Sequence, residues 1–191
     1  MEVRFQSHDF IEERSGDAPV FTGIIRFWDG TPGTEYVLKD TPGDKRVERI
    51  MPTAFDASLA SNDEIWAYYN HDSDRPLAVR SGSLALAKEA GGLRYRFPFT
   101  DHPLHELVRA DLKLRLLKGS SFGFHVTEEK WRAEGSFHVR EIHGVKLIEV
   151  SPVRSPAYSS STIGLRSNAS TQDAEASWRA YQTKIRFERH R

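Results

Sequence analysis

Cysteine is absent from all 191 residues of the sequence. Its absence excludes disulfides, zinc sites built from thiolate ligands and a cysteine nucleophile. Any covalent catalysis by this chain would therefore need an oxygen, lysine or histidine nucleophile.

Neither sign of charge predominates. Lys and Arg together number 27, as do Asp and Glu, so the formal net charge is zero when histidine is neutral. A balanced chain has no overall field that draws it to nucleic acid or to an anionic membrane. We therefore expect no nucleic acid and no membrane among its partners.

The sequence also lacks a long apolar run. No segment approaches the ~20 apolar residues needed to cross a bilayer. Residues 1–9 mix charged and apolar side chains, unlike a signal peptide. We expect the protein to stay in the compartment where it is made.

The composition that is present is typical of a folded globular protein, with 38% hydrophobic and 11% aromatic residues. After Pro156 it changes to Ser, Ala, Thr and Asn, which is typical of a linker. Trp178, Tyr181 and Ile185 then recur at helical spacing. We predict one domain over residues 1–157, followed by a Ser-rich linker and a short helical tail over residues 158–191.

Strand patterns dominate the first part of the chain, because β-branched and aromatic runs alternate with Gly, Pro and Asp turns. The run at residues 64–70 is apolar on both sides, which predicts a strand buried on both faces. The other expected strands are residues 19–28, 35–39 and 120–127, with hairpins formed by 83–87 and 93–99 and by 137–142 and 145–150.

Two helices are expected between these strands. Residues 52–60 have Pro in the first turn and place Phe55 and Leu59 on one face. Residues 104–117 are rich in leucine, and Gly119 is a natural stop for that helix. The sequence thus predicts a β-rich α+β domain.

Three polar positions could carry chemistry. His71 follows the apolar run at 64–70, Ser121 precedes an aromatic residue and a glycine, and Glu149 interrupts an apolar strand. Histidine commonly activates a serine hydroxyl because its pKa of ~6.5 lies near working pH. A carboxylate or a second imidazole then orients the histidine. Each position taken singly is equally typical of a turn, a strand start or an outward-facing glutamate.

Taken in order, these segments resemble the caudovirus (tailed-phage) prohead serine protease family. The segments that carry the resemblance are Asn70-His71-Asp72, Ser121-Phe122-Gly123-Phe124 and Glu149-Val150-Ser151-Pro152-Val153-Arg154-Ser155-Pro156-Ala157. Residues 48–55 also look like the family's Glu-Xaa-Ile-Xaa-Pro-Gly-Ala-Phe, with Thr53 in place of Gly. The resemblance covers about residues 18 to 157.

The resemblance implies a serine endopeptidase whose fold is a mostly antiparallel β-barrel flanked by helices, similar to herpesvirus assemblin. It implies that Ser121 is the nucleophile, His71 the general base and Glu149 the residue that orients the imidazole. Assemblin-type proteases use a second histidine in the third place, so His125 and His143 remain alternatives to Glu149. No cofactor is expected.

Two further assignments stay open. Ser120 is an alternative nucleophile, although the family serine directly precedes the aromatic residue and glycine. The oxyanion that forms during acyl transfer needs hydrogen-bond donors. Main-chain N–H groups near Gly123 or the side chain of Arg154 could supply them.

The same resemblance implies the biological setting. Relatives act in the procapsid interior, within the bacterial host cytoplasm, on phage scaffold and major capsid protein precursors and often on themselves. The linker after Ala157 is a suitable region for self-cleavage, and the helical tail a suitable docking element. A homodimer is expected by resemblance alone.

Two other classes of protein compete with this interpretation. One is a catalytically inactive capsid or scaffold-associated β-barrel that keeps the fold. The other is a metal hydrolase, although no set of ligands shows a known metal-site spacing. Its candidate ligands are His71, Asp72, His102, His105, His125 and His138.

Overall fold

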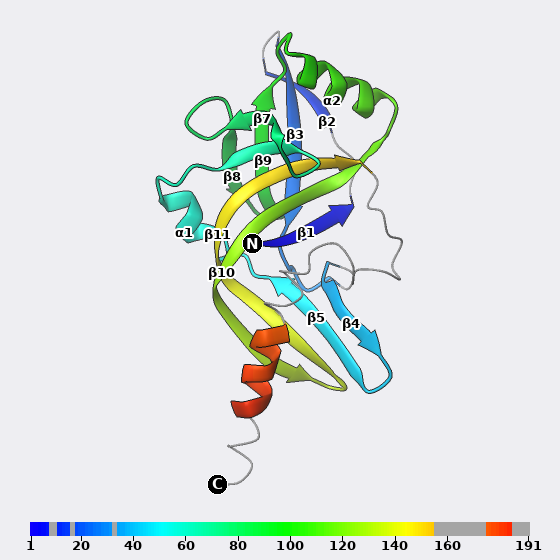
Figure 1. The fold of residues 1–191 in the computed structure, drawn as a ribbon, viewed down its shortest axis with the longest axis vertical. Coiled ribbons are helices and arrows are strands. Elements are labelled where there is room, and N and C mark those ends of the chain that lie inside the picture. The colour runs from blue at the N-terminus through cyan, green and yellow to red at the C-terminus, as the bar shows by residue number, and fades with distance from the viewer. Residues whose placement is uncertain (8–10, 16–17, 32–33, 155–174, 185–191) are drawn as a thin grey trace.

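The computed structural model describes residues 1–7, 11–15, 18–31, 34–154 and 175–184, and its strands form two sheets (Figure 1). The larger sheet has seven strands in the order β1-β10-β11-β5-β4, with β6 paired to β11 and to β7. These strands are β1 (Glu2–Ser7), β4 (Tyr36–Thr41), β5 (Asp44–Ile50), β6 (Trp66–Tyr69), β7 (Asp72–Val79), β10 (Leu117–Glu134) and β11 (Phe137–Arg154).

The smaller sheet has four antiparallel strands in the order β2-β3-β9-β8. They are β2 (Ile11–Ser15), β3 (Ala18–Arg26), β8 (Ala85–Glu89) and β9 (Gly92–Pro98). The labelled helices are α1 (Asp56–Ala60) and α2 (Pro103–Lys113), and a further helix spans residues 175–184. None of these helices combines the length and the apolar character that a membrane-crossing segment needs.

The long hairpin of β10 and β11 organises the larger sheet. The two strands have 18 residues each and pair antiparallel from Leu117↔Arg154 to Glu134↔Phe137. The first half of β11 pairs in parallel with β5, and its second half pairs in parallel with β6. β1 lies antiparallel on the other side of β10. β10 thus lies between β1 and β11, and β11 in turn brings β5 and β6 into the same sheet.

Aromatic side chains fill the core between the sheets. Phe122 and Phe124 of β10 stack with their ring centroids 5.0 Å apart, and Phe55 packs against Phe122 at 5.6 Å. Phe21 of β3 stacks on Phe97 of β9 at 4.8 Å. Burial of each ring contributes roughly 1.5–3 kcal/mol. Because neighbouring residues of a strand face opposite ways, this inward set leaves the side chain of Ser121 on the outer face of β10.

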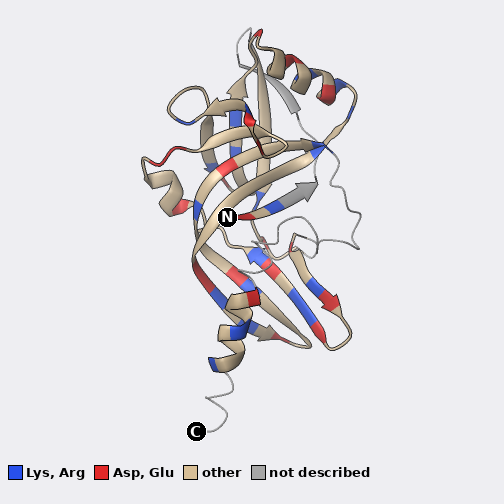
Figure 2. Cartoon of the chain, viewed as in Figure 1, with Lys and Arg blue, Asp and Glu red and all other residues tan. Residues whose placement is uncertain are grey.

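The expectation of a chain rich in strands with few helices is confirmed. The closed, mostly antiparallel barrel is not found, because the described strands form two separate sheets and β11 has two parallel partners. Beyond the core, the outer halves of β10 and β11 continue with β4 and β5 as an arm, formed by residues 36–50 and about 126–142 (Figure 1). The strands of this arm extend away from the core and do not curve round to close a barrel. Segments coloured for Lys and Arg are interspersed with segments coloured for Asp and Glu along the ribbon of this arm (Figure 2).

The predicted hairpin of residues 137–142 and 145–150 is wrong. The chain runs straight through Gly144 as the single strand β11. Gly144 lies opposite Glu128 at an irregular point of the β10–β11 register, and a Cβ there would lie 2.8 Å from Thr127 Oγ1. The glycine therefore permits close approach of a neighbouring strand instead of forming a turn.

Two other local predictions need correction. The helix expected over residues 104–117 ends at Lys113, and Arg115 has a positive φ of 55°, so the chain turns before β10 begins. β6 is not buried on both faces, because Ala67 and Tyr69 are buried whereas Trp66 and Tyr68 are partly exposed. The strands β1, β2, β5 and β7 were not expected from the sequence.

The helix of residues 175–184 packs on the arm (Figure 1). Trp178 is 6% exposed, and its ring centroid lies 5.1 Å from that of Trp131 and 4.6 Å from that of His138. Glu175 pairs with Arg46 at 2.9 Å. The predicted domain boundary at residue 157 and the linker suggested for self-cleavage lie outside the described residues.

Candidate active site

The side chains of Ser121, His71 and Glu149 form one hydrogen-bonded chain. His71 Nε2 lies 2.6 Å from Ser121 Oγ, and His71 Nδ1 lies 2.7 Å from Glu149 Oε1. A carboxylate can only accept, so Nδ1 carries the proton that it donates to Glu149. Nε2 of the neutral ring is then the acceptor for the serine hydroxyl proton. This tautomer is the one that a general base requires.

A tight turn places His71. β6 and β7 are joined through Asn70 and His71, whose φ values are 55° and 63°. Two successive positive φ angles are the mark of a type I′ hairpin turn, which matches the twist of the strands. Asn70 tolerates this conformation, whereas at His71 it costs about 1 kcal/mol or more. The turn is held on β11 by Asn70, which donates its N–H to Pro152 O at 3.2 Å and accepts from the N–H of Arg154 at 2.8 Å.

Register places the other two side chains. Ser121 of β10 pairs with Ser151 of β11, and Gly123 pairs with Glu149. Glu149 therefore projects from the same outer face as Ser121. A Cβ added to Gly123 would lie 2.6 Å from Glu149 Oε1. Gly123, which shares this face with Ser121, therefore makes room for the carboxylate.

The carboxylate is deeply buried. Glu149 is 2% exposed, and its second oxygen, Oε2, accepts a hydrogen bond from Ser151 Oγ at 2.6 Å. Ser151 Oγ also accepts from the N–H of His71 at 3.2 Å. Sequence reasoning missed Ser151, although it follows Glu149 by two residues and so faces the same side of a strand.

The hydroxyl of Ser121 has a second acceptor on β1. Ser121 Oγ donates to the main-chain carbonyl oxygen of Arg4 at 2.7 Å. β1 pairs with β10 so that Arg4 lies opposite Phe122, and Ser121 is only 1% exposed. The proximity of β1 to the serine was not visible in the sequence, because the pairing joins residues more than a hundred positions apart.

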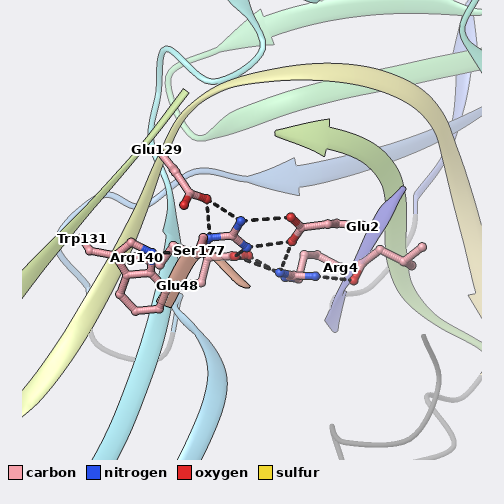
Figure 3. Close-up of polar contacts among 8 residues, drawn as sticks. Glu2, Arg4, Glu48, Glu129, Trp131, Arg140 and Ser177 are labelled. Atoms are coloured by element: carbon pink, nitrogen blue, oxygen red, sulfur yellow. Dashed lines mark hydrogen bonds and ion pairs between the residues drawn. The ribbon is translucent and has the colours of Figure 1, made fainter. Parts of the chain in front are cut away.

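A buried group of ionised side chains holds β1 in this position (Figure 3). Arg4 Nε lies 2.5 Å from Glu48 Oε1, and Arg140 Nη1 lies 2.8 Å from Glu2 Oε2 and 2.9 Å from Glu48 Oε2. Arg140 also pairs with Glu129 through Nε at 2.7 Å. Burial opposes ionisation of Glu48, but the charges of Arg4 and Arg140 outweigh it and hold the pKa of Glu48 below its ordinary value.

The alternative nucleophile points elsewhere. Ser120 faces the smaller sheet, where its Oγ lies 2.8 Å from the hydroxyl oxygen of Tyr95. Burial raises the pKa of Tyr95, so this phenol stays neutral and able to donate. Ser120 is therefore part of the core, on the opposite face of β10 from Ser121.

The alternative third residues also lie apart from the imidazole of His71. His143 Nε2 lies 3.4 Å from Glu141 Oε2. His125 lines a pocket on the arm side of the sheet with Glu129 and Arg140. The atom that contacts His71 Nδ1 belongs to Glu149.

Arg154, an expected oxyanion donor, is engaged with α2. Its Nε and Nη2 lie 2.6 and 2.9 Å from the two oxygens of Asp111, which also accepts from the hydroxyl of Tyr69 at 2.5 Å. Burial, followed by this hydrogen bond, raises the pKa of Tyr69 to about 12. The arrangement fastens the ends of β6 and β11 to α2. The other expected donor was the main chain near Gly123. Gly123 is paired with Val3 of β1 on one side and with Glu149 of β11 on the other.

The histidines proposed as metal ligands do not converge. His105 contacts Thr100 through Nδ1 and the carbonyl oxygen of Leu77 through Nε2, and His102 caps α2 by accepting from the N–H of Leu104. Across the described ranges, no group of three or more His, Asp or Glu side chains is placed to hold a metal ion.

Comparison with known proteins gives one match. A family model of the caudovirus prohead serine proteases matches residues 32–175 of the 191. No curated protein and no solved structure matches the chain. The matched segment carries the β6–β7 turn, β10 and β11, from which the three hydrogen-bonded side chains come. The chain therefore belongs to the caudovirus prohead serine protease family.

Proposed function

We propose that this chain is a serine endopeptidase that cleaves phage scaffold and major capsid protein precursors during procapsid maturation. The family supports a protease role in capsid maturation. The observation that carries the assignment of residues is the position of His71, with Nε2 at 2.6 Å from a serine hydroxyl and Nδ1 at 2.7 Å from a buried carboxylate.

In the proposed reaction Ser121 Oγ attacks the carbonyl carbon of the scissile peptide bond while its proton passes to His71 Nε2. The C–N bond then breaks as the same proton moves to the departing amine, which leaves an acyl-enzyme ester on Ser121. Water gives a proton to Nε2 and attacks the ester, and the proton returns to Ser121 Oγ as the peptide acid departs.

Glu149 accepts a hydrogen bond and exchanges no proton with the substrate in this cycle. Its carboxylate holds the proton of His71 on Nδ1 and stabilises the imidazolium that forms when Nε2 accepts the serine proton. A charge-assisted hydrogen bond in a buried site is stronger than the same bond in water. The 2% exposure of Glu149 therefore favours this role.

The proposed setting follows from the family. We expect the protease to act in the procapsid interior, within the bacterial host cytoplasm. Its own linker, between the strand domain and the helix of residues 175–184, is a further candidate substrate.

Incubation with the major capsid protein precursor from the same phage genome tests the proposal. The wild-type protein should shorten the precursor and bind a fluorophosphonate covalently, and Ser121→Ala should do neither. Ser120→Ala is the matched control, because it removes the neighbouring buried hydroxyl, which bonds to Tyr95 on the opposite face. It should retain both activities.

The competing assignment makes the opposite prediction. A folded wild-type protein that leaves the capsid precursor intact and takes up no fluorophosphonate would be a capsid-associated structural protein. Equal labelling of Ser121→Ala and wild type would show that another residue reacts.

A further inference from the structure

Ser151 lies where the β6–β7 turn, which carries His71, meets β11, which carries Glu149. It lies on β11 opposite Ser121 of β10, and it is 0% exposed. Its hydroxyl contacts Glu149 Oε2 at 2.6 Å and the N–H of His71 at 3.2 Å. A serine hydroxyl has one proton and two lone pairs. Since an N–H only donates and a carboxylate only accepts, both contacts form at once and fix the direction of the O–H bond.

This contact restrains the carboxylate. The last torsion of a glutamate side chain is broad, so a carboxylate held at one oxygen can rotate. Here each oxygen of Glu149 has its own partner, His71 Nδ1 at Oε1 and Ser151 Oγ at Oε2. Rotation would break one of these hydrogen bonds in a buried place, where an unpaired polar group is strongly disfavoured.

The same hydroxyl restrains the main chain of His71. A φ of 63° is uncommon for a residue other than glycine and persists where its surroundings hold it. The N–H of His71 is bonded to Ser151 Oγ, while the preceding residue, Asn70, is bonded to Pro152 and Arg154. Ser151 is the member of this set that also contacts a side chain of the proposed triad.

We propose that Ser151 is a positioning residue for the proposed protease reaction. One hydroxyl ties the carboxylate of Glu149 to the main chain of His71, so that Nδ1–H stays on Oε1 and Nε2 stays beside Ser121 Oγ. Ser151 acts through these two residues and exchanges no proton with the substrate. The inference rests on the proposed function and adds a fourth residue to it.

The chain offers a matched control that separates a positioning role of Ser151 from a purely structural one. Ser58 of α1 is another buried serine whose hydroxyl donates once, to Val145 O at 2.6 Å, and accepts once, from the N–H of Leu147 at 2.9 Å. Both of its partners are main-chain groups of β11, and its hydroxyl contacts neither His71 nor Glu149. Ser58→Ala therefore removes the same number of buried hydrogen bonds without loosening Glu149 or His71.

The experiment compares wild type, Ser151→Ala, Ser151→Thr and Ser58→Ala in three measurements. These are kcat and KM on a peptide from the capsid precursor, the low-field proton resonance of His71 Nδ1–H, and thermal unfolding. Ser151→Ala should lower kcat by about 10- to 100-fold with little change in KM, as loss of an orienting partner does elsewhere. Its Nδ1–H resonance should broaden through exchange with water.

The other two variants separate positioning from stability. Ser151→Thr keeps the hydroxyl and should restore both kcat and the resonance. Ser58→Ala should lower the unfolding temperature while leaving both unchanged. The proposal is overturned if Ser151→Ala loses only stability, as Ser58→Ala does, and keeps a wild-type kcat and a sharp resonance. This comparison of the two alanine variants decides the matter even if the threonine variant does not fold.

Failure of the proposed protease function can be distinguished from failure of the proposal for Ser151. A wild-type protein that neither cleaves nor reacts with fluorophosphonate overturns the protease assignment. The resonance of His71 would still report on Ser151 in that case. Its loss in Ser151→Ala alone would support the positioning, and its persistence would overturn it.

Discussion

The main-chain carbonyl oxygen of Arg4 lies 2.7 Å from Ser121 Oγ, so the hydroxyl proton has an acceptor on β1 as well as on His71. A hydroxyl donates to one of them at a time. The side chain of Met1 lies close to the same face of β10, because a Cβ added to Gly123 would lie 2.9 Å from Met1 Sδ. Gly123 and Ser121 share that face, so Met1 lies over the site. Attack needs the substrate carbon about 3–3.5 Å from the nucleophile. With Ser121 only 1% exposed, we expect residues 1–4 to shift before a peptide reaches it.

Loosening β1 should therefore expose Ser121. Arg4→Gln removes one of the two arginines that neutralise buried Glu48, and loss of a buried partner costs about 3–5 kcal/mol. Each ~1.4 kcal/mol is a factor of ten in the open population, so a loss of this size would raise that population by about 100-fold or more. We expect fluorophosphonate to label Ser121 faster by about the same factor. Arg49→Gln is the control, because Arg49 is also buried but pairs with Glu134 and Glu35. Equal labelling rates in the two variants would contradict the prediction.

Glu149→Gln should preserve the shape of the site and abolish most of the activity. The amide can donate to Nδ1, which would leave the proton on Nε2 and deprive Ser121 of its acceptor. We expect kcat to fall by about 10⁴-fold, as in triads that lose their carboxylate. Glu141→Gln, beside His143, should stay within a few-fold of wild type. Comparable losses in both variants would indicate that Glu149 has no special role.

Gly123→Ala tests whether the space left by the glycine is needed for the carboxylate of Glu149. The added methyl group would lie 2.6 Å from Glu149 Oε1, so we expect the carboxylate to shift and its contact with His71 Nδ1 to be disturbed. A displacement of about 1 Å in such a site can cost about 100-fold in rate. Gly91→Ala is the control, since a Cβ there meets nothing within 4 Å. Steady-state kinetics on the capsid-precursor peptide should show the loss in the first variant alone.

Acid should destabilise the protein through Glu48. Its pKa is lower in the folded state than in the unfolded state, so its contribution is present above the unfolded value of about 4.3 and is lost as pH falls through the folded value. Urea unfolding between about pH 3 and 7 should show this fall. Glu48→Gln should reduce stability at pH 7 by about 3–5 kcal/mol and flatten the pH profile. Parallel profiles for wild type and variant would be incompatible with this account.

Self-cleavage of the linker is tested by the intact mass of the purified chain. The wild-type protein should lose residues after position 157 over time, and Ser121→Ala should keep its full mass. Trp178→Ala removes the main apolar contact of the helix of residues 175–184 with Trp131 and His138. It should hasten release of the tail in the active protein. An equally shortened chain in Ser121→Ala would assign the cut to another protease.

Much of the fold followed from local patterns. Side chains of a strand alternate with a period of two, so the expected strand over residues 120–127 puts Ser121 and Gly123 on the face opposite Phe122 and Phe124. The helices 52–60 and 104–117 and the hairpin of β8 and β9 were recovered with shifted ends, since turns such as that at Arg115 depend on their neighbours. The hairpin predicted around Gly144 was wrong, because a glycine permits the close approach of a neighbouring strand as readily as it permits a turn.

By itself, the sequence excluded a cysteine nucleophile, and the resemblance of its ordered segments to the family made a histidine after one strand and a serine on another the expected pair. It could not determine which of Glu149, His125 and His143 contacts that histidine, nor that Arg4 reaches Ser121. Those contacts depend on strand pairing between distant segments, and β10 and β11 acquire their partners through register and burial that no local pattern encodes. The tertiary structure alone brought a carboxylate to one ring nitrogen of His71 and a hydroxyl to the other.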